Sequence, residues 1–206
     1  GFDQDGFEPF GYIDKSGNWI GFDIDLAKEC VKIMDDYDSV QLVPIAWDTK
    51  DSEMSSGTVD VIWNGFTIQG RENDYQWTEP YMTNSQVILV GENSGINSKE
   101  DLAGKVVGSQ KDSSGLSALE ADKDLMSIIK NQSAMQFDGY ETAIMELESG
   151  SVDALVIDEQ VIKVKIANGS VKGFKILDDA ISSEDYGVAA AKGNTKLVEE
   201  LQTALN

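Results

Sequence analysis

SGTVDVIWNG (residues 56–65) and SGSVDALVID (residues 149–158) align with each other without a gap. Each copy begins with Ser-Gly, continues through Thr or Ser and Val-Asp, and ends in an apolar run. A glycine that follows a helical pattern is a common helix end, and a short apolar run bounded by such signals is typical of a buried strand. The repeated pattern therefore predicts the same helix–strand unit twice, which suggests two lobes of similar build.

The remaining sequence alternates between β-prone and helical patterns, the order expected of an α/β fold with largely parallel sheets. Two β-prone runs around residues 16–18 predict a hairpin. Helices are predicted over residues 23–36, 50–56, 113–130 and 140–150, with Gly57 ending the second and Asp138 with Glu141 capping the last. Ser98 and Asp101 predict one further short helix. Strands are predicted over residues 40–47, 59–64, 106–110 and 152–157.

The composition excludes several classes of function. A net charge of -21 over 206 residues repels nucleic acids and anionic membranes. No run reaches the ~18 apolar residues of a membrane helix, and no leader pattern opens the sequence. The absence of histidine removes Ser-His-Asp and Cys-His nucleophilic sites and ordinary zinc sites. Cys30 is the single cysteine, expected to be buried, and rules out an internal disulfide. The segment DQDGFE matches only part of a calcium loop, so neither a metal nor another cofactor is predicted.

Arg71 is the only arginine among the 16 cationic side chains. A guanidinium binds a carboxylate through two parallel hydrogen bonds, which a lysine ammonium cannot reproduce. A plain surface ion pair with Glu72 or Asp74 is the alternative interpretation. The use of arginine at this one position favours a specific anion-binding role.

The ends of the two repeated strands carry polar residues in corresponding places. Asn64 and Gly65 end the first copy, with Thr67 close behind, and Asp158 ends the second. Because ligands of open α/β sheets bind beyond the carboxyl ends of strands, both ends are candidate sites, with a cleft between the two predicted lobes. Asp158 suits an ammonium, although a solvated loop acid is the alternative.

Ser113 and Ser114 precede a predicted helix in the second lobe. A helix N-terminus presents free N–H groups that suit a carboxylate or phosphate, while both serines are equally compatible with simple N-caps. Together with Arg71 and Asp158, this set describes the head group of an α-amino acid. Among the aromatic residues, most of which belong in the core, Phe7 and Trp47 are predicted at the cleft.

Several sequence blocks resemble the family 3 solute-binding proteins, the polar amino-acid receptors of ABC importers. FEPFGYIDKSGNWIGFDIDLAKE resembles the opening block, and VDVIWNGFTIQGREN, WTEPYMTNSQVILV, EDLAGKVVGSQKDSSG, VDALVIDE and DYGVAAAKGN resemble the later ones in the same order. The resemblance covers nearly the whole chain. The spacing before Arg71 is shorter than usual in the family, the spacing from Asp3 to Phe7 is longer, and Asp112 replaces an expected glycine.

The resemblance implies a periplasmic-binding-protein-like (type II) Venus flytrap of two α/β lobes. Lobe 1 would comprise residues 1–88 and 187–206, lobe 2 residues 91–183, with hinge strands near 87–91 and 185–189. In such proteins a strand usually precedes the position of Gly1, and a further helix usually follows the last residue here.

The resemblance also implies roles for single residues. Arg71 would bind the ligand α-carboxylate with Thr67 and Ser114, and Asp158 would bind the α-ammonium with the main chain near Gly65. Phe7 would stack on the ligand side chain. Trp47 would form another wall position, and Asp3, Asn64 and Ser113 complete the predicted set.

The predicted function is therefore that of an extracytoplasmic, monomeric binding protein without enzymatic activity. It would bind a free L-amino acid and deliver it to an ABC transporter permease, from the periplasm or as a lipid-anchored protein at the cell surface. A sensor domain of a receptor and a lyase on the same scaffold are the alternative interpretations.

Overall fold

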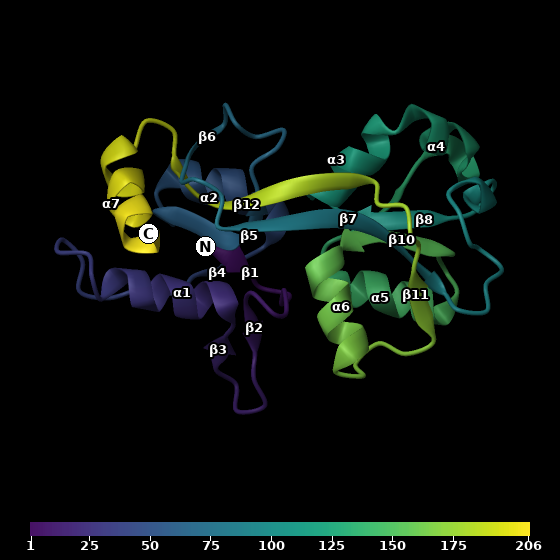
Figure 1. The fold of residues 1–206 in the computed structure, drawn as a ribbon, viewed down its shortest axis with the longest axis horizontal. Coiled ribbons are helices and arrows are strands. Elements are labelled where there is room, and N and C mark those ends of the chain that lie inside the picture. The colour runs from purple at the N-terminus through teal and green to yellow at the C-terminus, as the bar shows by residue number, and fades with distance from the viewer. The chain divides into compact units, whose positions relative to one another are not determined.

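The computed structural model describes residues 1–206, which form two compact units. Unit 1 comprises residues 1–83 and 184–206, and unit 2 comprises residues 84–183. Two strands, β7 (Met82–Gly91) and β12 (Ser182–Ala191), carry the chain from one unit to the other (Figure 1). Unit 1 is therefore built from two separate stretches of sequence.

Unit 1 contains a small sheet and a hairpin in addition to the strands that lead into unit 2. β12 pairs antiparallel with β5 and β6, β1 pairs parallel with β4, and β2 forms the hairpin with β3. The bounds are β1 (Phe2–Asp3), β2 (Tyr12–Ile13), β3 (Trp19–Ile20), α1 (Phe22–Val31), β4 (Pro44–Ile45), η1 (Trp47–Thr49), α2 (Lys50–Ser56), β5 (Val61–Thr67), β6 (Tyr75–Trp77) and α7 (Thr195–Leu205).

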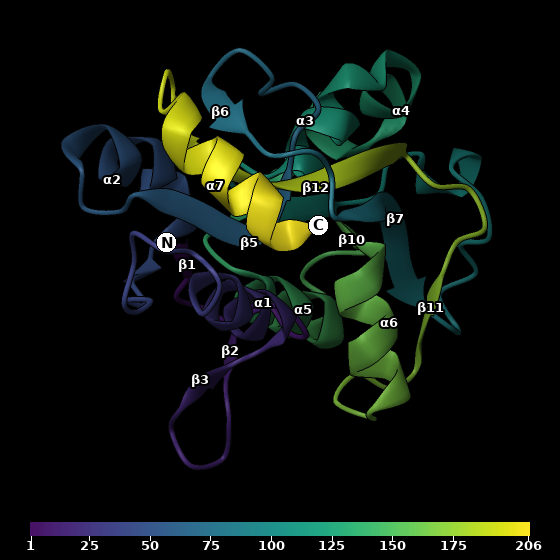
Figure 2. The same ribbon diagram turned by 60° about the vertical axis from the view of Figure 1, so that its left-hand side comes forward.

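The strands of unit 1 bury both faces. Because successive side chains of a strand point to opposite faces, Ile62 packs with Met54 of α2 while Trp63 packs with Cys30 of α1 and Leu201 of α7. Figure 2 shows α1 and α7 on the sheet near the two chain termini. The predicted burial of Cys30 is confirmed, since only 2% of this residue is exposed.

Unit 2 is a five-stranded arrangement in the order β9-β8-β10-β7-β11. β9, β8 and β10 are parallel, whereas β7 runs antiparallel to both of its neighbours β10 and β11. The bounds are η2 (Glu100–Leu102), β8 (Val107–Gln110), α3 (Ser114–Ala121), α4 (Lys123–Ile128), η3 (Lys130–Gln132), β9 (Met135–Phe137), α5 (Tyr140–Ser149), β10 (Ala154–Asp158), α6 (Glu159–Ala167) and β11 (Phe174–Ile176).

The repeated sequence forms the same local structure in both units. α2 ends at Gly57 (φ 75°) and α5 ends at Gly150 (φ 80°), both left-handed. In each copy the next residue donates its N–H back into the helix, Thr58 to Glu53 O and Ser151 to Glu146 O. The chain then enters β5 in unit 1 and β10 in unit 2, as the alignment of the two copies predicts.

Three predicted elements and one predicted helix cap differ from the structure. The helix predicted over residues 113–130 is two helices, because Asp122 accepts a hydrogen bond from Leu125 N and so caps a second one. The strand predicted over residues 40–47 is reduced to β4, and the helix predicted to residue 36 ends at Val31. Asp138 does not cap α5, whose N-cap is Gly139 and makes no side-chain bond.

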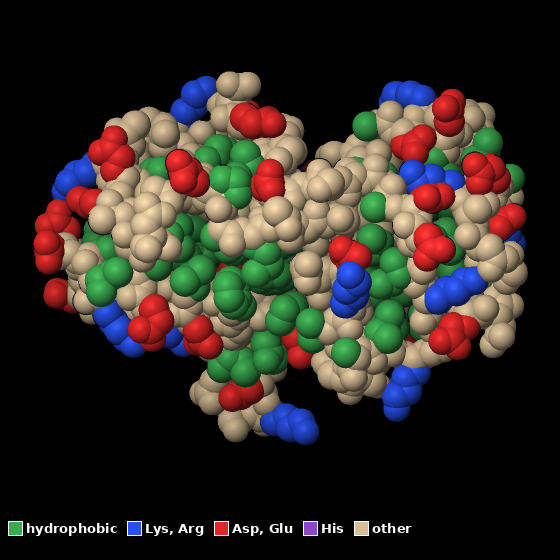
Figure 3. All heavy atoms as spheres, in the orientation of Figure 1, with side chains coloured by type: hydrophobic (Ala, Val, Ile, Leu, Met, Phe, Trp, Pro, Cys, Tyr) green, Lys and Arg blue, Asp and Glu red, His purple; other side chains and the backbone are tan.

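The surface is strongly acidic. Figure 3 shows Asp and Glu side chains spread over the visible face of both units, with the Lys side chains set singly among them. None of the helices has both the length and the apolar character needed to cross a membrane.

Candidate functional site

A β-bulge lies in β5 at the residues predicted to bind a ligand. The pairs Gly187–Phe66 and Ala189–Ile62 bracket two residue steps on β12 but four on β5. The extra residues include Asn64 and Gly65, and Gly65 has a left-handed φ of 54°. Bulges bend a strand and redirect its side chains, and they recur beside functional sites. The bulge therefore gives Asn64 and Gly65 a backbone unlike that of an ordinary strand.

Glycine is required at position 65 because two aromatic rings lie against its backbone. A Cβ there would lie 2.8 Å from Cε1 of Phe7 and 3.0 Å from Cε2 of Tyr186. Phe7 also packs on Phe10, with 5.5 Å between the ring centroids. The structure thus brings together Phe7 and Gly65, which are far apart in the sequence.

The carboxylate of Asp23, from the first turn of α1, holds the backbone of the bulge. Its Oδ2 accepts hydrogen bonds from Gly65 N at 2.6 Å and from the Tyr81 hydroxyl at 2.9 Å. Burial raises the pKa of Asp23 to about 7, while the two donors act in the opposite direction by favouring the anion. Asp23 and Tyr81 were not among the predicted site residues, although Asp23 lies in the GFDID stretch that carries the family resemblance.

Arg71 and Thr67 are neighbours at the exit of β5. Nη1 of Arg71 donates to Thr67 O at 3.2 Å, and the guanidinium carbon lies 5.0 Å from the ring centroid of Phe66. Trp77 Nε1 donates to Arg71 O at 3.0 Å, which fixes the backbone of this turn. The guanidinium is therefore held by the aromatic face of Phe66 and by the carbonyl group of Thr67.

Trp47 and Asp3 are both deeply buried within unit 1. Trp47 is 7% exposed and makes an edge-to-face contact with Phe66 in the hydrophobic cluster that also contains Met54. Asp3 is 2% exposed, and its Oδ1 accepts from Asp5 N at 2.9 Å. These contacts are sufficient to explain both residues structurally, and their roles in ligand binding stay predictions.

In unit 2, Ser113 and Ser114 lie at the start of α3. Ser113 is the N-cap: its Oγ accepts from Leu116 N at 3.0 Å and donates to Gln110 O at 2.7 Å. Ser114 Oγ accepts from Nε2 of Gln86 at 3.1 Å. The cap interpretation therefore accounts for the observed bonds of Ser113, whereas Ser114 belongs to a side-chain pair with β7.

Asp158 ends β10, beside the strand that leads to α3. Asn84 Nδ2 donates to its Oδ1 at 2.7 Å, and the Tyr140 hydroxyl donates to its Oδ2. Asp158 is 4% exposed, so the solvated loop acid that sequence left open is excluded. Each carboxylate oxygen can accept more than one hydrogen bond, so an ammonium partner is compatible with this arrangement. Asn84, Gln86 and Tyr140 were not predicted, because they meet Asp158 and Ser114 only through strand pairing and helix packing.

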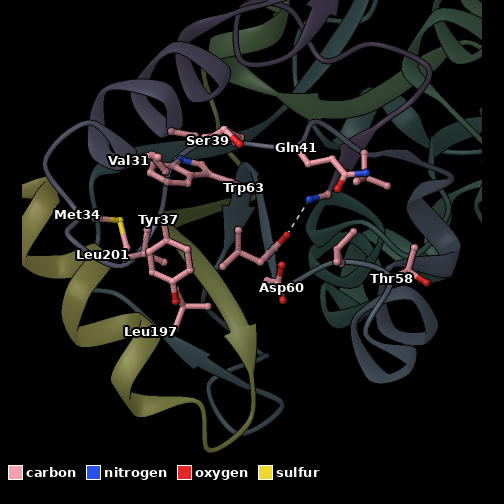
Figure 4. A pocket seen from close by; sticks show the side chains of 16 residues that line it. Val31, Met34, Tyr37, Ser39, Gln41, Thr58, Asp60, Trp63, Leu197 and Leu201 are labelled. Atoms are coloured by element: carbon pink, nitrogen blue, oxygen red, sulfur yellow. Dashed lines mark hydrogen bonds between the residues drawn. The ribbon is translucent and has the colours of Figure 1, made fainter.

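A separate pocket of about 330 Å³ lies within unit 1 (Figure 4). Gly1 borders it, and the backbone nitrogen of this residue donates to Val61 O at 2.7 Å. Figure 4 shows apolar side chains of α1 and α7 along one part of the wall and Thr58, Asp60 and Gln41 along another. None of the predicted ligand-binding residues lines this pocket. The side chains also form no group of three or more potential metal ligands.

Comparison with known proteins identifies the family. The sequence profile of the bacterial extracellular solute-binding proteins, family 3, matches residues 1–206. The chain belongs to this family. A probable histidine-binding protein of Neisseria gonorrhoeae is 31% identical, over 97% of this chain and 73% of the relative.

Solved structures of similar binding proteins have the same fold. A substrate-binding protein of an ABC uptake transporter from Streptococcus pneumoniae, with bound histidine, has a TM-score of 0.92 at 33% identity, covering 98% of this chain and 82% of that one. An arginine-bound variant of ArgBP from T. maritima has a TM-score of 0.87 at 30% identity, covering 99% and 92%. The predicted fold class, that of type II periplasmic binding proteins, is confirmed.

Proposed function

We propose that this family 3 protein binds a free L-amino acid outside the cytoplasm and delivers it to the membrane permease of an ABC importer. The observation that carries the proposal is the placement of Arg71, the only arginine, beside Thr67 at the exit of a bulged strand. A planar guanidinium suits a carboxylate, and Thr67, whose backbone carbonyl the guanidinium contacts, also carries a hydroxyl that can donate to one. The similar proteins named above support an amino acid as the ligand, because they are named for histidine or arginine or contain one of them.

The proposal assigns the two charges of the amino acid to different residues. Unit 1 supplies Arg71 and Thr67 for the α-carboxylate and the backbone at Gly65 for the α-ammonium. Unit 2 supplies Asp158 for the ammonium and Ser114 for the carboxylate. Phe7, which lies against Gly65, is the candidate for contact with the ligand side chain.

The protein is proposed to release its ligand unchanged rather than to act as an enzyme. Its relatives are named as binding proteins, and some of them as binding proteins of ABC transporters. We further propose that it acts as a monomer, either free or attached to the cell surface by a lipid anchor. Recovery of intact ligand after incubation tests the absence of enzymatic turnover, and size-exclusion chromatography tests the monomeric state.

A thermal-shift screen over the common L-amino acids tests the proposed ligand class, starting with histidine, arginine and glutamine. A ligand that binds only the folded state at about 1,000 times its Kd adds about 4 kcal/mol of stability, which raises the melting temperature by several degrees. The matched controls are the α-amide and the N-acetyl derivative of the best ligand, each of which lacks one charge. We expect both derivatives to lose the shift. Equal shifts with the α-amide would contradict the role of Arg71, and no shift with any amino acid would contradict the ligand class.

A further inference from the structure

The N–H of Gly65 donates its hydrogen bond to a side chain instead of to the carbonyl group of a neighbouring strand. The bulge removes this residue from the regular register between β5 and β12. A buried N–H without a partner is costly, and the carboxylate of Asp23 supplies the acceptor at 2.6 Å. Asp23 is 1% exposed. The conformation of the bulge therefore depends on a buried acid from another element, α1.

The same carboxylate also binds the segment that enters β7. The hydroxyl of Tyr81 donates to Asp23 Oδ2, and Tyr81 N donates to Tyr186 O of β12 at 2.9 Å. The ring of Tyr186 in turn lies against Gly65. Asp23 thus connects the bulge to the segment that enters β7, and this segment is bonded in turn to β12.

Two buried oxygens in this region have no hydrogen-bond donor. They are Oδ1 of Asp23 and Oδ1 of Asn64, the residue that precedes Gly65. Asn64 is 2% exposed, so water does not reach it freely. A proton on Oδ1 of Asp23 would remove the charge from a buried carboxylate oxygen that has no donor, which favours proton uptake.

We propose that Asp23 is a positioning residue for the ligand: its anionic form holds the β5 bulge in the conformation that binds the amino acid, so ligand binding is coupled to proton release from Asp23. This inference rests on the proposed function, because the backbone at Gly65 is a proposed ligand contact. Asp23 itself does not touch the ligand and acts through the backbone of Gly65.

The charged surroundings of Asp23 leave few other groups that could produce the same pH dependence. β3 and β5, which contact α1, carry no charged side chain, and β1 contributes Asp3. α7 carries Lys196, Glu199 and Glu200, and Lys196 is paired with Glu200 and with Asp36. Asp5 and Glu8 precede α1 in the chain. Burial raises the pKa of Asp23, and the hydrogen bonds from Gly65 and Tyr81 lower it. No neighbouring charge is among the causes of the shift.

The size of the pH effect follows from the fraction of protein that carries anionic Asp23. With a pKa of about 7, roughly one molecule in eleven is anionic at pH 6, and the apparent Kd rises in inverse proportion to that fraction. Affinity for L-arginine, whose groups do not titrate between pH 5.5 and 8, should therefore fall about tenfold from pH 8 to pH 6. Asp23→Asn keeps an acceptor oxygen but cannot titrate.

The experiment is calorimetric titration of L-arginine, or of the best ligand from the screen that does not titrate, at pH 5.5 to 8. We expect the wild type and Asp25→Asn to lose about tenfold in affinity by pH 6, because Asp25 is an exposed acid on the same helix. Asp23→Asn should bind with the same affinity at every pH, and Asp23→Ala should bind about tenfold or more weakly at pH 8. A pH dependence in Asp23→Asn that equals that of the wild type would overturn the proposal.

A second readout is independent of any ligand. Carbon-13 NMR of the aspartate carboxyls should show Asp23 titrating near pH 7, and exchange of the Gly65 amide with solvent should accelerate below that pH and in Asp23→Ala. Normal exchange of Gly65 in a folded Asp23→Ala would overturn the inference, whether or not an amino acid binds. Unchanged binding by Arg71→Lys would instead contradict the head-group assignment and leave the Asp23 titration to be judged by these NMR data.

Discussion

Replacing Gly65 with alanine tests whether the packing of Phe7 and Tyr186 against the bulge requires glycine at this position. The residue has a φ of 54°, and an added Cβ would meet Phe7 at 2.8 Å and Tyr186 at 3.0 Å. A left-handed backbone costs an L-residue about 1 to 2 kcal/mol, and overpacking a buried site costs about 1 to 3 kcal/mol more. Reduced entropy of the unfolded chain offsets about 0.4 to 1 kcal/mol. The expected loss of unfolding free energy is about 3 kcal/mol.

Gly57→Ala is the matched control for this prediction. Gly57 also has a left-handed φ, of 75°, but nothing lies within 4 Å of an added Cβ. Its loss should be about 1 kcal/mol, because only the backbone term and the entropy offset apply. Urea unfolding monitored by tryptophan fluorescence gives both values without ligand. Equal losses for the two variants would refute the argument that the aromatic rings require glycine at position 65.

Three further predictions concern stability. Glu141→Gln should lower the unfolding free energy by about 1.5 to 3 kcal/mol in urea titrations, because Lys165 is 5% exposed and would lose its charged partner, whereas Glu159→Gln, in an exposed pair, should change it by less than about 1 kcal/mol. Asp112→Gly should raise the melting temperature, since Asp112 has a φ of 53° that glycine adopts without strain; an unchanged or lower value would contradict this reasoning. Asp23 has its pKa raised from 3.8 to about 7, so the folded state holds the extra proton between these values and stability falls as pH rises through that window. Relative to Asp23→Asn, the wild type should lose on the order of 4 kcal/mol from pH 4 to pH 8, and parallel stability–pH curves would show that Asp23 does not titrate there.

Local signals in the sequence were sufficient to predict the repeated helix–strand unit. Gly57 and Gly150 end their helices in the left-handed conformation that glycine favours, and the following apolar runs form β5 and β10. Asp122 caps the second of two helices, although the periodic apolar pattern continues through it and predicted a single helix. Asp122 is therefore visible in the sequence as a possible N-cap, but the prediction followed the continuous apolar pattern and missed the break between the two helices.

The network around Gly65 depends on contacts that a linear sequence does not reveal. The sequence identified Gly65 and Phe7 as candidates, but the bulge comes from the register between β5 and β12, which are distant in the chain. Asp23 resembles any other acid in the first turn of an amphipathic helix until that register places Gly65 N beside it. For the same reason, Asn84 and Tyr140 could not be connected with Asp158 before the sheet was known.

The most direct test of the central claim is calorimetric binding of the best amino-acid ligand to wild-type protein and to Arg71→Lys. Lysine keeps the positive charge but loses the planar fork, and a charged hydrogen bond contributes about 1.5 to 3 kcal/mol. The proposed function predicts a Kd at least about tenfold higher for Arg71→Lys and an unchanged Kd for Lys28→Ala, which removes a surface cation from α1. Equal affinity of wild type and Arg71→Lys for an amino acid would contradict the assignment of Arg71 to the ligand carboxylate.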